Sequence, residues 1–170
     1  MKRTLVICCF LAVLFIQNIN SQTLGGLYTE KNAGFTMSMP SGWQTIDANQ
    51  KYLMIIGPAE NGFSPNMGFA DEAYIGSLSG YIDNLISIFN QFYTGLVIIN
   101  RGSFSTNSGL QGAYVIIQGR MGQISVRQKI YVFPGLKTDE IITIAGSAPI
   151  GNERFDSIFD ECVKTFKWTK

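Results

Sequence analysis

The chain has 170 residues, of which 13 are Lys or Arg, 12 are Asp or Glu and none is His, so its formal net charge is +1. This near balance, without any run of basic residues, excludes the charge pattern of a nucleic-acid-binding domain. The lack of histidine excludes Ser-His-Asp and Cys-His nucleophiles and the commonest zinc ligand sets.

The N-terminal segment has the layout of a secretory signal peptide. Lys2 and Arg3 form a positive end, residues 4–16 form an apolar run, and residues 17–21 are polar and end in a small residue. The apolar run is too short to span a bilayer comfortably. We therefore predict a signal peptide at residues 1–21, no membrane span after its cleavage, and a secreted or periplasmic protein. The alternative is an uncleaved anchor.

Cleavage after Ser21 leaves 149 residues, with 11 basic and 12 acidic side chains. A chain of this length buries enough surface for one stable domain. Cys162 is the only cysteine in this part of the sequence, so an intramolecular disulfide is excluded. The sequence contains no internal repeat or linker, and we predict a single domain over residues 22–170.

The first part of this domain predicts three strands. In residues 35–39, Phe and Met alternate with Thr and Ser, the period of a half-buried strand. Pro40 ends this strand, and the turn that follows is expected to fold Trp43 against the core or the last helix. Residues 52–58 and 66–75 predict the second and third strands.

The segment from Ser77 to Tyr93 predicts an amphipathic helix, because its apolar residues recur at helical spacing. Ser77 or Ser79 is placed to cap it and Gly95 to end it. Strands are then predicted at residues 95–106, 112–119, 123–133 and 140–146. Their short, glycine-containing connections favour antiparallel hairpins and leave no room for crossover helices.

A second amphipathic helix is predicted near the C-terminus. Its apolar stripe comprises Phe155, Ile158, Phe159, Cys162, Val163 and Phe166. Asn152 is placed to cap its start. Cys162 lies on the stripe without a basic neighbour, so we expect a buried structural residue and not a reactive thiol.

The order of these elements predicts an α+β fold. Each amphipathic helix needs a sheet face to cover, which favours a three-layer α/β/α sandwich. We expect a mainly antiparallel central sheet of about six to seven strands, with a helix on each face.

Three stretches of the sequence resemble the PsbP-like superfamily. They are "FTMSMPSGW" at residues 35–43, "SPNMGFADEA" at residues 64–73 and "FDSIFDECVKTFKW" at residues 155–168. That superfamily includes the extrinsic photosystem II protein, a Ran-binding nuclear import factor and bacterial exported domains, and the last group fits a chain with a signal peptide. The resemblance implies the three-layer fold and a non-enzymatic binding or assembly role.

The sequence contains no motif for catalysis, a cofactor or a metal. "GSLSG" at residues 76–80 has its serines in the wrong positions for a nucleophile elbow, and there is no calcium-binding loop. Two carboxylate pairs, Asp71/Glu72 and Asp139/Glu140, are adjacent in sequence and so point to opposite faces of a strand. We therefore predict that the protein is not an enzyme and has no cofactor.

A candidate binding surface is predicted on the mixed face of residues 123–133. It comprises Arg120, Gln123, Arg127, Lys129 and Tyr131, and Phe63 in a separate loop is a further candidate. Cationic groups edged by aromatic rings suit an anionic ligand or a protein partner. The alternative is a solvated sheet edge whose aromatic rings pack under a helix.

We therefore favour an exported, non-catalytic module that binds an envelope protein. The first alternative is a carrier of a small apolar or anionic ligand held between a helix and the sheet. The second is a hydrolase that depends on carboxylates, which the divergence of the carboxylate pairs disfavours.

Overall fold

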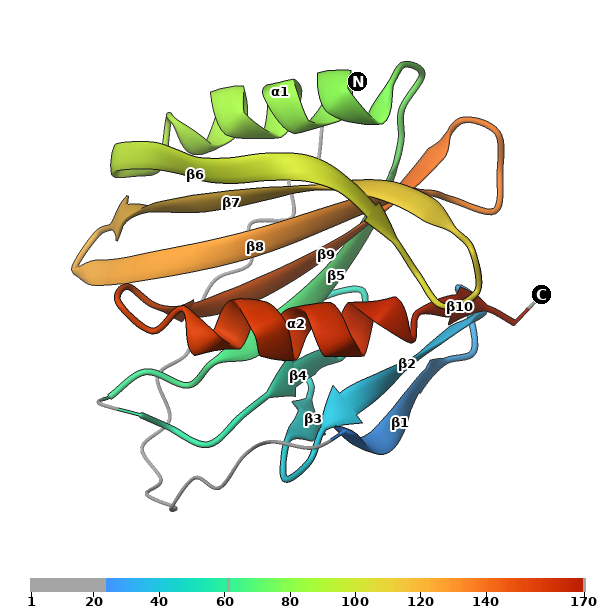
Figure 1. The fold of residues 1–170 in the computed structure, drawn as a ribbon, viewed down its shortest axis with the longest axis horizontal. Helices are drawn as coiled ribbons and strands as arrows, with labels where there is room; N and C mark the ends of the chain where they lie inside the picture. Colours follow the sequence, from blue (N-terminus) through green and yellow to red (C-terminus); the bar gives the residue numbers. More distant parts are fainter. Residues whose placement is uncertain (1–23, 61, 170) are drawn as a thin grey trace.

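The computed structural model describes residues 24–60 and 62–169, so the predicted signal peptide at residues 1–21 lies outside the described residues. Its largest element is a seven-stranded sheet in the order β3-β4-β5-β9-β8-β7-β6, with antiparallel pairing throughout (Figure 1). The strands are β3 (Gln44–Ile46), β4 (Met54–Ile56), β5 (Asn66–Ala73), β6 (Thr94–Ser105), β7 (Gln111–Met121), β8 (Ile124–Pro134) and β9 (Glu140–Pro149).

Two helices and a small second sheet complete the fold. The helices are α1 (Leu78–Phe89) and α2 (Arg154–Lys164), and the second sheet has the order β1-β2-β10. Its strands are β1 (Leu24–Glu30), β2 (Phe35–Pro40) and β10 (Lys167–Trp168). The predicted α+β class, the antiparallel sheet and both helices are confirmed.

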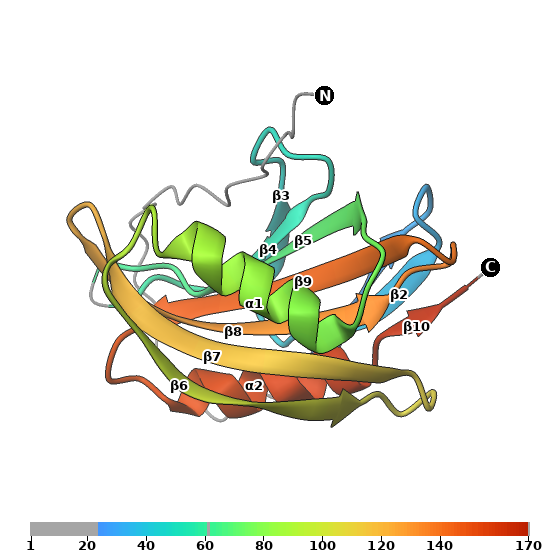
Figure 2. The ribbon, with the colours of Figure 1, turned by 90° about the horizontal axis from the view of Figure 1, so that it is seen from above.

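The hydrophobic core consists of two clusters that use alternate residues of β8. Ile130 and Val132 pack with α1, whereas Tyr131 and Phe133 pack with α2. This is the period-two alternation expected of a strand that is buried on both sides. Accordingly α1 contacts β7 and β8, and α2 contacts β9 and also β2 of the small sheet (Figure 2).

The turn after β2 brings Trp43 onto α2. Gly42 has φ +80°, a conformation that glycine adopts without strain, and the Trp43 amide donates to the Pro40 carbonyl at 3.2 Å. The indole ring is 6% exposed and packs against Phe155 and Phe159. The prediction that Trp43 folds against the core or the last helix is confirmed, since the ring lies in the core cluster that includes Phe155 and Phe159.

The helix ends agree with the sequence at one terminus and differ at two. Ser77 caps α1, because its hydroxyl accepts from the Gly80 amide at 3.1 Å. Gly95 does not end α1: the helix finishes at Phe89, and Gly95 lies in β6 with φ +66°. Asn152 does not cap α2 either, because its side-chain nitrogen Nδ2 donates to the Glu60 carboxylate instead.

Candidate functional site

The central residues of the predicted cationic surface are buried beneath α2. Arg127 and Lys129 are each 7% exposed, and Tyr131 is fully buried. Arg127 donates to both carboxylate oxygens of Asp156, with its shorter bond, from Nη2 to Oδ2, at 2.7 Å. Lys129 Nζ and the Tyr131 hydroxyl each lie 2.7 Å from Oδ1 of Asp160. We call these five residues the β8–α2 network.

The spacing within the two elements explains this network. Its three β8 members occupy alternate positions on one face of the strand, and its two carboxylates are one helical turn apart on α2. Hydrogen bonding to Asp156 raises the pKa of Arg127, and burial raises the pKa of Tyr131, followed by the charge of Asp160. The two cations are therefore neutralised by carboxylates of their own chain.

The other predicted surface residues lie elsewhere. Arg120 and Gln123 are exposed at the turn between β7 and β8, where the guanidinium donates to the Gln123 side-chain oxygen at 3.3 Å. Phe63 is half-buried in the loop between β4 and β5, which is closed by two backbone hydrogen bonds to Glu60. The structure thus separates the predicted surface into three places, and its role in binding stays a prediction.

The carboxylate pair on β5 diverges as the sequence predicted. Asp71 forms an ion pair with Lys51, whereas Glu72 accepts a hydrogen bond from the Tyr81 hydroxyl of α1. Adjacent positions on the strand account for the difference in partners, since their side chains leave opposite faces. The pair does not form an acid and base directed at one substrate.

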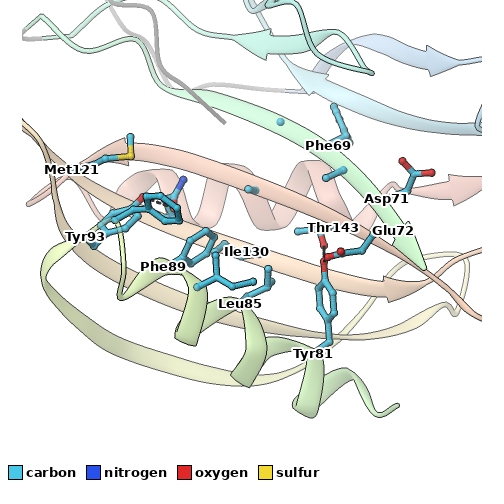
Figure 3. Close-up of a pocket in the computed structure, with 16 residues that line it drawn as sticks. Phe69, Asp71, Glu72, Tyr81, Leu85, Phe89, Tyr93, Met121, Ile130 and Thr143 are labelled. Atoms are coloured by element: carbon cyan, nitrogen blue, oxygen red, sulfur yellow. Dashed lines mark hydrogen bonds between the residues drawn. The ribbon is translucent and has the colours of Figure 1, made fainter. Parts of the chain in front are cut away.

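A groove lies between α1 and the sheet, the kind of place that the carrier alternative gives to a ligand, although the sequence did not indicate its residues (Figure 3). Its volume is about 110 Å³. We call it the α1 groove and define it by its apolar wall and floor, which comprise Leu85, Phe89, Gly68, Ala70, Ile130 and Ala145. An apolar concavity with a few polar groups at defined positions is the usual form of a small-molecule site.

Hydrogen-bonded polar groups lie at both ends of the α1 groove, as Figure 3 shows for Glu72, Tyr81 and Thr143 at one end and Tyr93 at the other. The Tyr81 hydroxyl donates to Oε1 of Glu72 and lies 3.2 Å from the Thr143 hydroxyl. Burial, followed by the bond to Glu72, raises the pKa of Tyr81. At the far end, the Tyr93 hydroxyl donates to the side-chain oxygen of Gln128 at 2.7 Å.

Small side chains on two paired strands create the space for the groove. In the β5–β9 register, Gly68 pairs with Ala145 and Ala70 pairs with Thr143. α1 packs mainly on β7 and β8, and the short side chains on β5 and β9 leave space next to it. The sequence signal was the short side chains at alternate positions of both strands, but their pairing joins segments about 75 residues apart.

A second unusual surface is the free edge of the large sheet. β6 is the last strand of the sheet order, so one side of its backbone has no strand partner in the described structure. Val97, Ile98 and Ile99 on this strand are 50%, 45% and 42% exposed. Long apolar edges of this kind are sites at which another strand can add.

Within residues 24–60 and 62–169, no group of three or more His, Cys, Asp or Glu could hold a metal ion. In those two ranges no helix is both long enough and apolar enough to cross a bilayer.

The fold and the groove together define a small α+β domain with a concave apolar site. Several solved structures have a similar fold. The chain resembles cyanobacterial PsbP from Synechocystis, with a TM-score of 0.61, 14% identity, and 92% of this chain and 98% of that one covered. The Ran-binding protein Mog1p of Saccharomyces cerevisiae gives a TM-score of 0.61 at 7% identity, with 87% and 97% covered.

A third similar structure is LpqN, a Mycobacterium tuberculosis protein involved in cell envelope biogenesis. It gives a TM-score of 0.59 at 11% identity, with 80% of this chain and 83% of that one covered. The sequence itself matches no protein-family model and no curated protein. The chain therefore has the PsbP-like fold that its sequence predicted.

Proposed function

We propose that this protein is a non-catalytic binding module that receives a small ligand with an apolar body in the α1 groove. The observation that carries this proposal is the groove itself, with its apolar wall and floor and its polar ends. The side chains that line the groove include no activated nucleophile, and the sequence has no histidine to act as an imidazole base. Binding without chemistry is the use that these groups support.

We infer a three-layer α/β/α sandwich as the scaffold of this module, with one helix covering each face of the large sheet. The two hydrophobic clusters support this arrangement, because α1 and α2 pack against alternate residues of β8. In such a sandwich the α1 layer is free to hold a ligand while the β8–α2 network holds the other layer in place.

We also propose that the module is residues 22–170 and that it is exported after removal of a signal peptide at residues 1–21. The layout of the N-terminal segment supports this proposal. Expression in a host with a secretion system should deliver a protein whose intact mass corresponds to a first residue of Gln22. A retained N-terminus in the membrane fraction would instead support an anchor.

Ligand binding in the groove is tested with a small neutral probe. Phenethyl alcohol should shift amide signals of β5, β9 and α1 in protein-observed NMR at millimolar concentration. Ala145→Phe or Leu85→Trp should abolish these shifts by filling the groove, and each variant's own spectrum would show that it is folded. Ile75→Phe is the matched control, because Ile75 is 90% exposed and does not line the groove. Unchanged shifts in both filled variants would contradict the proposal.

A second candidate function is assembly with an envelope protein through the free edge of β6. The three exposed apolar residues of that edge favour it. Mog1p, which has a similar fold, is a Ran-binding protein and so binds another protein. Arg120, Gln123 and Phe63 stay proposed as further contacts, since none of them is fully buried.

The edge is tested by co-purification from the protein's own cell envelope. Ile98→Lys should lose a partner that the native chain and Ile75→Lys both retain, because a charge in the middle of an edge strand opposes strand addition. A native protein that is a monomer and recovers no reproducible partner would contradict this candidate function.

A further inference from the structure

The α1 groove has a charge preference that follows from Glu72. We infer that its ligand is a small amine, with an ammonium group bound to Glu72 and an apolar body along the groove. This inference rests on the proposed function and adds the chemical class of the ligand.

The Glu72 carboxylate has unused capacity to accept hydrogen bonds. The Tyr81 hydroxyl donates one hydrogen bond to it, whereas an ionised carboxylate can accept about four. Neighbouring carboxylates are already neutralised, since Asp71 pairs with Lys51 and Glu140 pairs with Lys137. Among the described residues, no lysine or arginine forms an ion pair with Glu72.

The rest of the lining carries no positive charge. Among the 16 lining residues drawn in Figure 3, Asp71 and Glu72 are charged and none is lysine or arginine. The Asp71 side chain leaves the opposite face of β5 and pairs with Lys51, so the unneutralised charge is that of Glu72. A carboxylate at one end of an apolar groove attracts a cation and repels an anion, by a modest amount here because Glu72 is exposed to solvent. An anionic ligand, which the sequence suggested through Arg127 and Lys129, does not suit this groove.

The volume and lining of the groove set the size and polarity of the ligand body. A dry apolar cavity of about 150 Å³ holds one benzene ring, so a groove of about 110 Å³ that opens to solvent suits a single ring or a short alkyl chain. Leu85, Phe89 and Ile130 supply apolar contact along its length. At the far end Tyr93 and Gln128 are bonded to each other, so the ligand needs no second polar group there.

Three probes of matched shape test the inference. Phenethylamine, phenethyl alcohol and hydrocinnamate carry the same ring on a cationic, neutral and anionic group, respectively. NMR titration at neutral pH should give about five-fold tighter binding of the amine than of the alcohol, the value of one partly exposed ion pair. The anion should bind more weakly than the alcohol. Added salt should reduce the preference for the amine because it screens the charge.

Two variants assign this preference to Glu72. Glu72→Gln keeps an acceptor for Tyr81 and removes the charge, so the ratio of the amine affinity to the alcohol affinity should fall from about five to about one. Glu161→Gln, an exposed change on α2, is the matched control and should keep the preference. Both readouts are ratios of affinities and are independent of a small loss of stability.

The outcomes separate the inference from the proposed function. If the alcohol binds and the amine binds no better, or if Glu72→Gln keeps the preference, the inference is wrong while the proposed function stands. If none of the three probes binds, or if Ala145→Phe and Leu85→Trp bind all of them normally, the proposed function is wrong and the inference falls with it.

Discussion

Trp43 illustrates how much one residue contributes to this fold. Its ring lies 6.2 Å from the Phe155 ring and 6.3 Å from the Phe159 ring between centroids, and it packs the turn after β2 onto α2. We expect Trp43→Ala to lower the free energy of unfolding by about 3 kcal/mol, because the change leaves a large cavity. Urea denaturation measures it, with the exposed Ile75→Ala as control. A loss below about 0.5 kcal/mol would show that the ring contributes little.

Cys162 gives a prediction about reactivity. The side chain is fully buried, and burial raises the pKa of its thiol to about 12. The thiolate is the reactive form, so the folded mature protein should not react with a disulfide reagent at neutral pH. The same protein in urea should consume one equivalent. Rapid reaction of the folded protein would mean that α2 opens readily.

Predictions for single residues succeeded where local sequence decides the outcome. Ser77 caps α1 by accepting from the amide of Gly80, three residues further along the chain. Cys162 is buried because it lies on an apolar stripe. They failed at Asn152, whose side chain bonds to Glu60, a residue 92 positions away. Arg127 and Lys129 are a similar case, since the carboxylates that bind them belong to another element.

At the scale of elements, the long periodic segments and the short apolar strand β4 were predicted, whereas β1, β3 and β10 were not. α1 and α2 lie within the predicted segments to within a few residues, and β6 to β9 were all found. β1 contains adjacent glycines and lacks a clear alternation, while β3 and β10 are three and two residues long. Such strands are defined by their pairing partners, which a local pattern does not contain.

The β8–α2 network predicts how α2 is held to the sheet. Asp160→Asn removes the charge that neutralises buried Lys129 and should lower the free energy of unfolding by about 2–3 kcal/mol, somewhat less than for a fully buried pair. Glu161→Gln changes the neighbouring, exposed carboxylate and should cost less than about 0.5 kcal/mol. Urea denaturation of both variants makes the comparison.

A double variant separates neutralisation from simple packing. Lys129→Met combined with Asp160→Asn removes both charges together and keeps an acceptor for the Tyr131 hydroxyl, so it should recover most of the stability lost in Asp160→Asn alone, because no unpaired charge is then buried. Equal stability of the double variant and Asp160→Asn would show that the unpaired charge of Lys129 does not determine the effect.

At the scale of the whole molecule, the order of elements predicted the fold, but the candidate site depends on how the elements meet. The α1 groove requires Gly68 to pair with Ala145 and α1 to pack beside them, and neither relation follows from a local pattern. Charged residues drew attention to β8, whereas small and apolar residues that carry no chemical signature form the groove. The fold was therefore more predictable than the site.

The whole fold should lose stability in alkali because several tyrosines are held protonated. Burial raises the pKa of Tyr52 from 10.0 to about 12 and also raises the pKa values of Tyr28, Tyr81 and Tyr131. Above pH 10.0 the unfolded chain releases these protons and the folded chain retains them, so the free energy of unfolding falls as pH rises. This contribution is fully present below pH 10.0 and is lost as pH passes through about 12.

Urea midpoints measured from neutral pH upward should therefore decline above pH 10.0, with phenolate absorbance of these residues appearing together with unfolding. Titration of all four near pH 10.0 in a chain that stays folded would contradict this coupling.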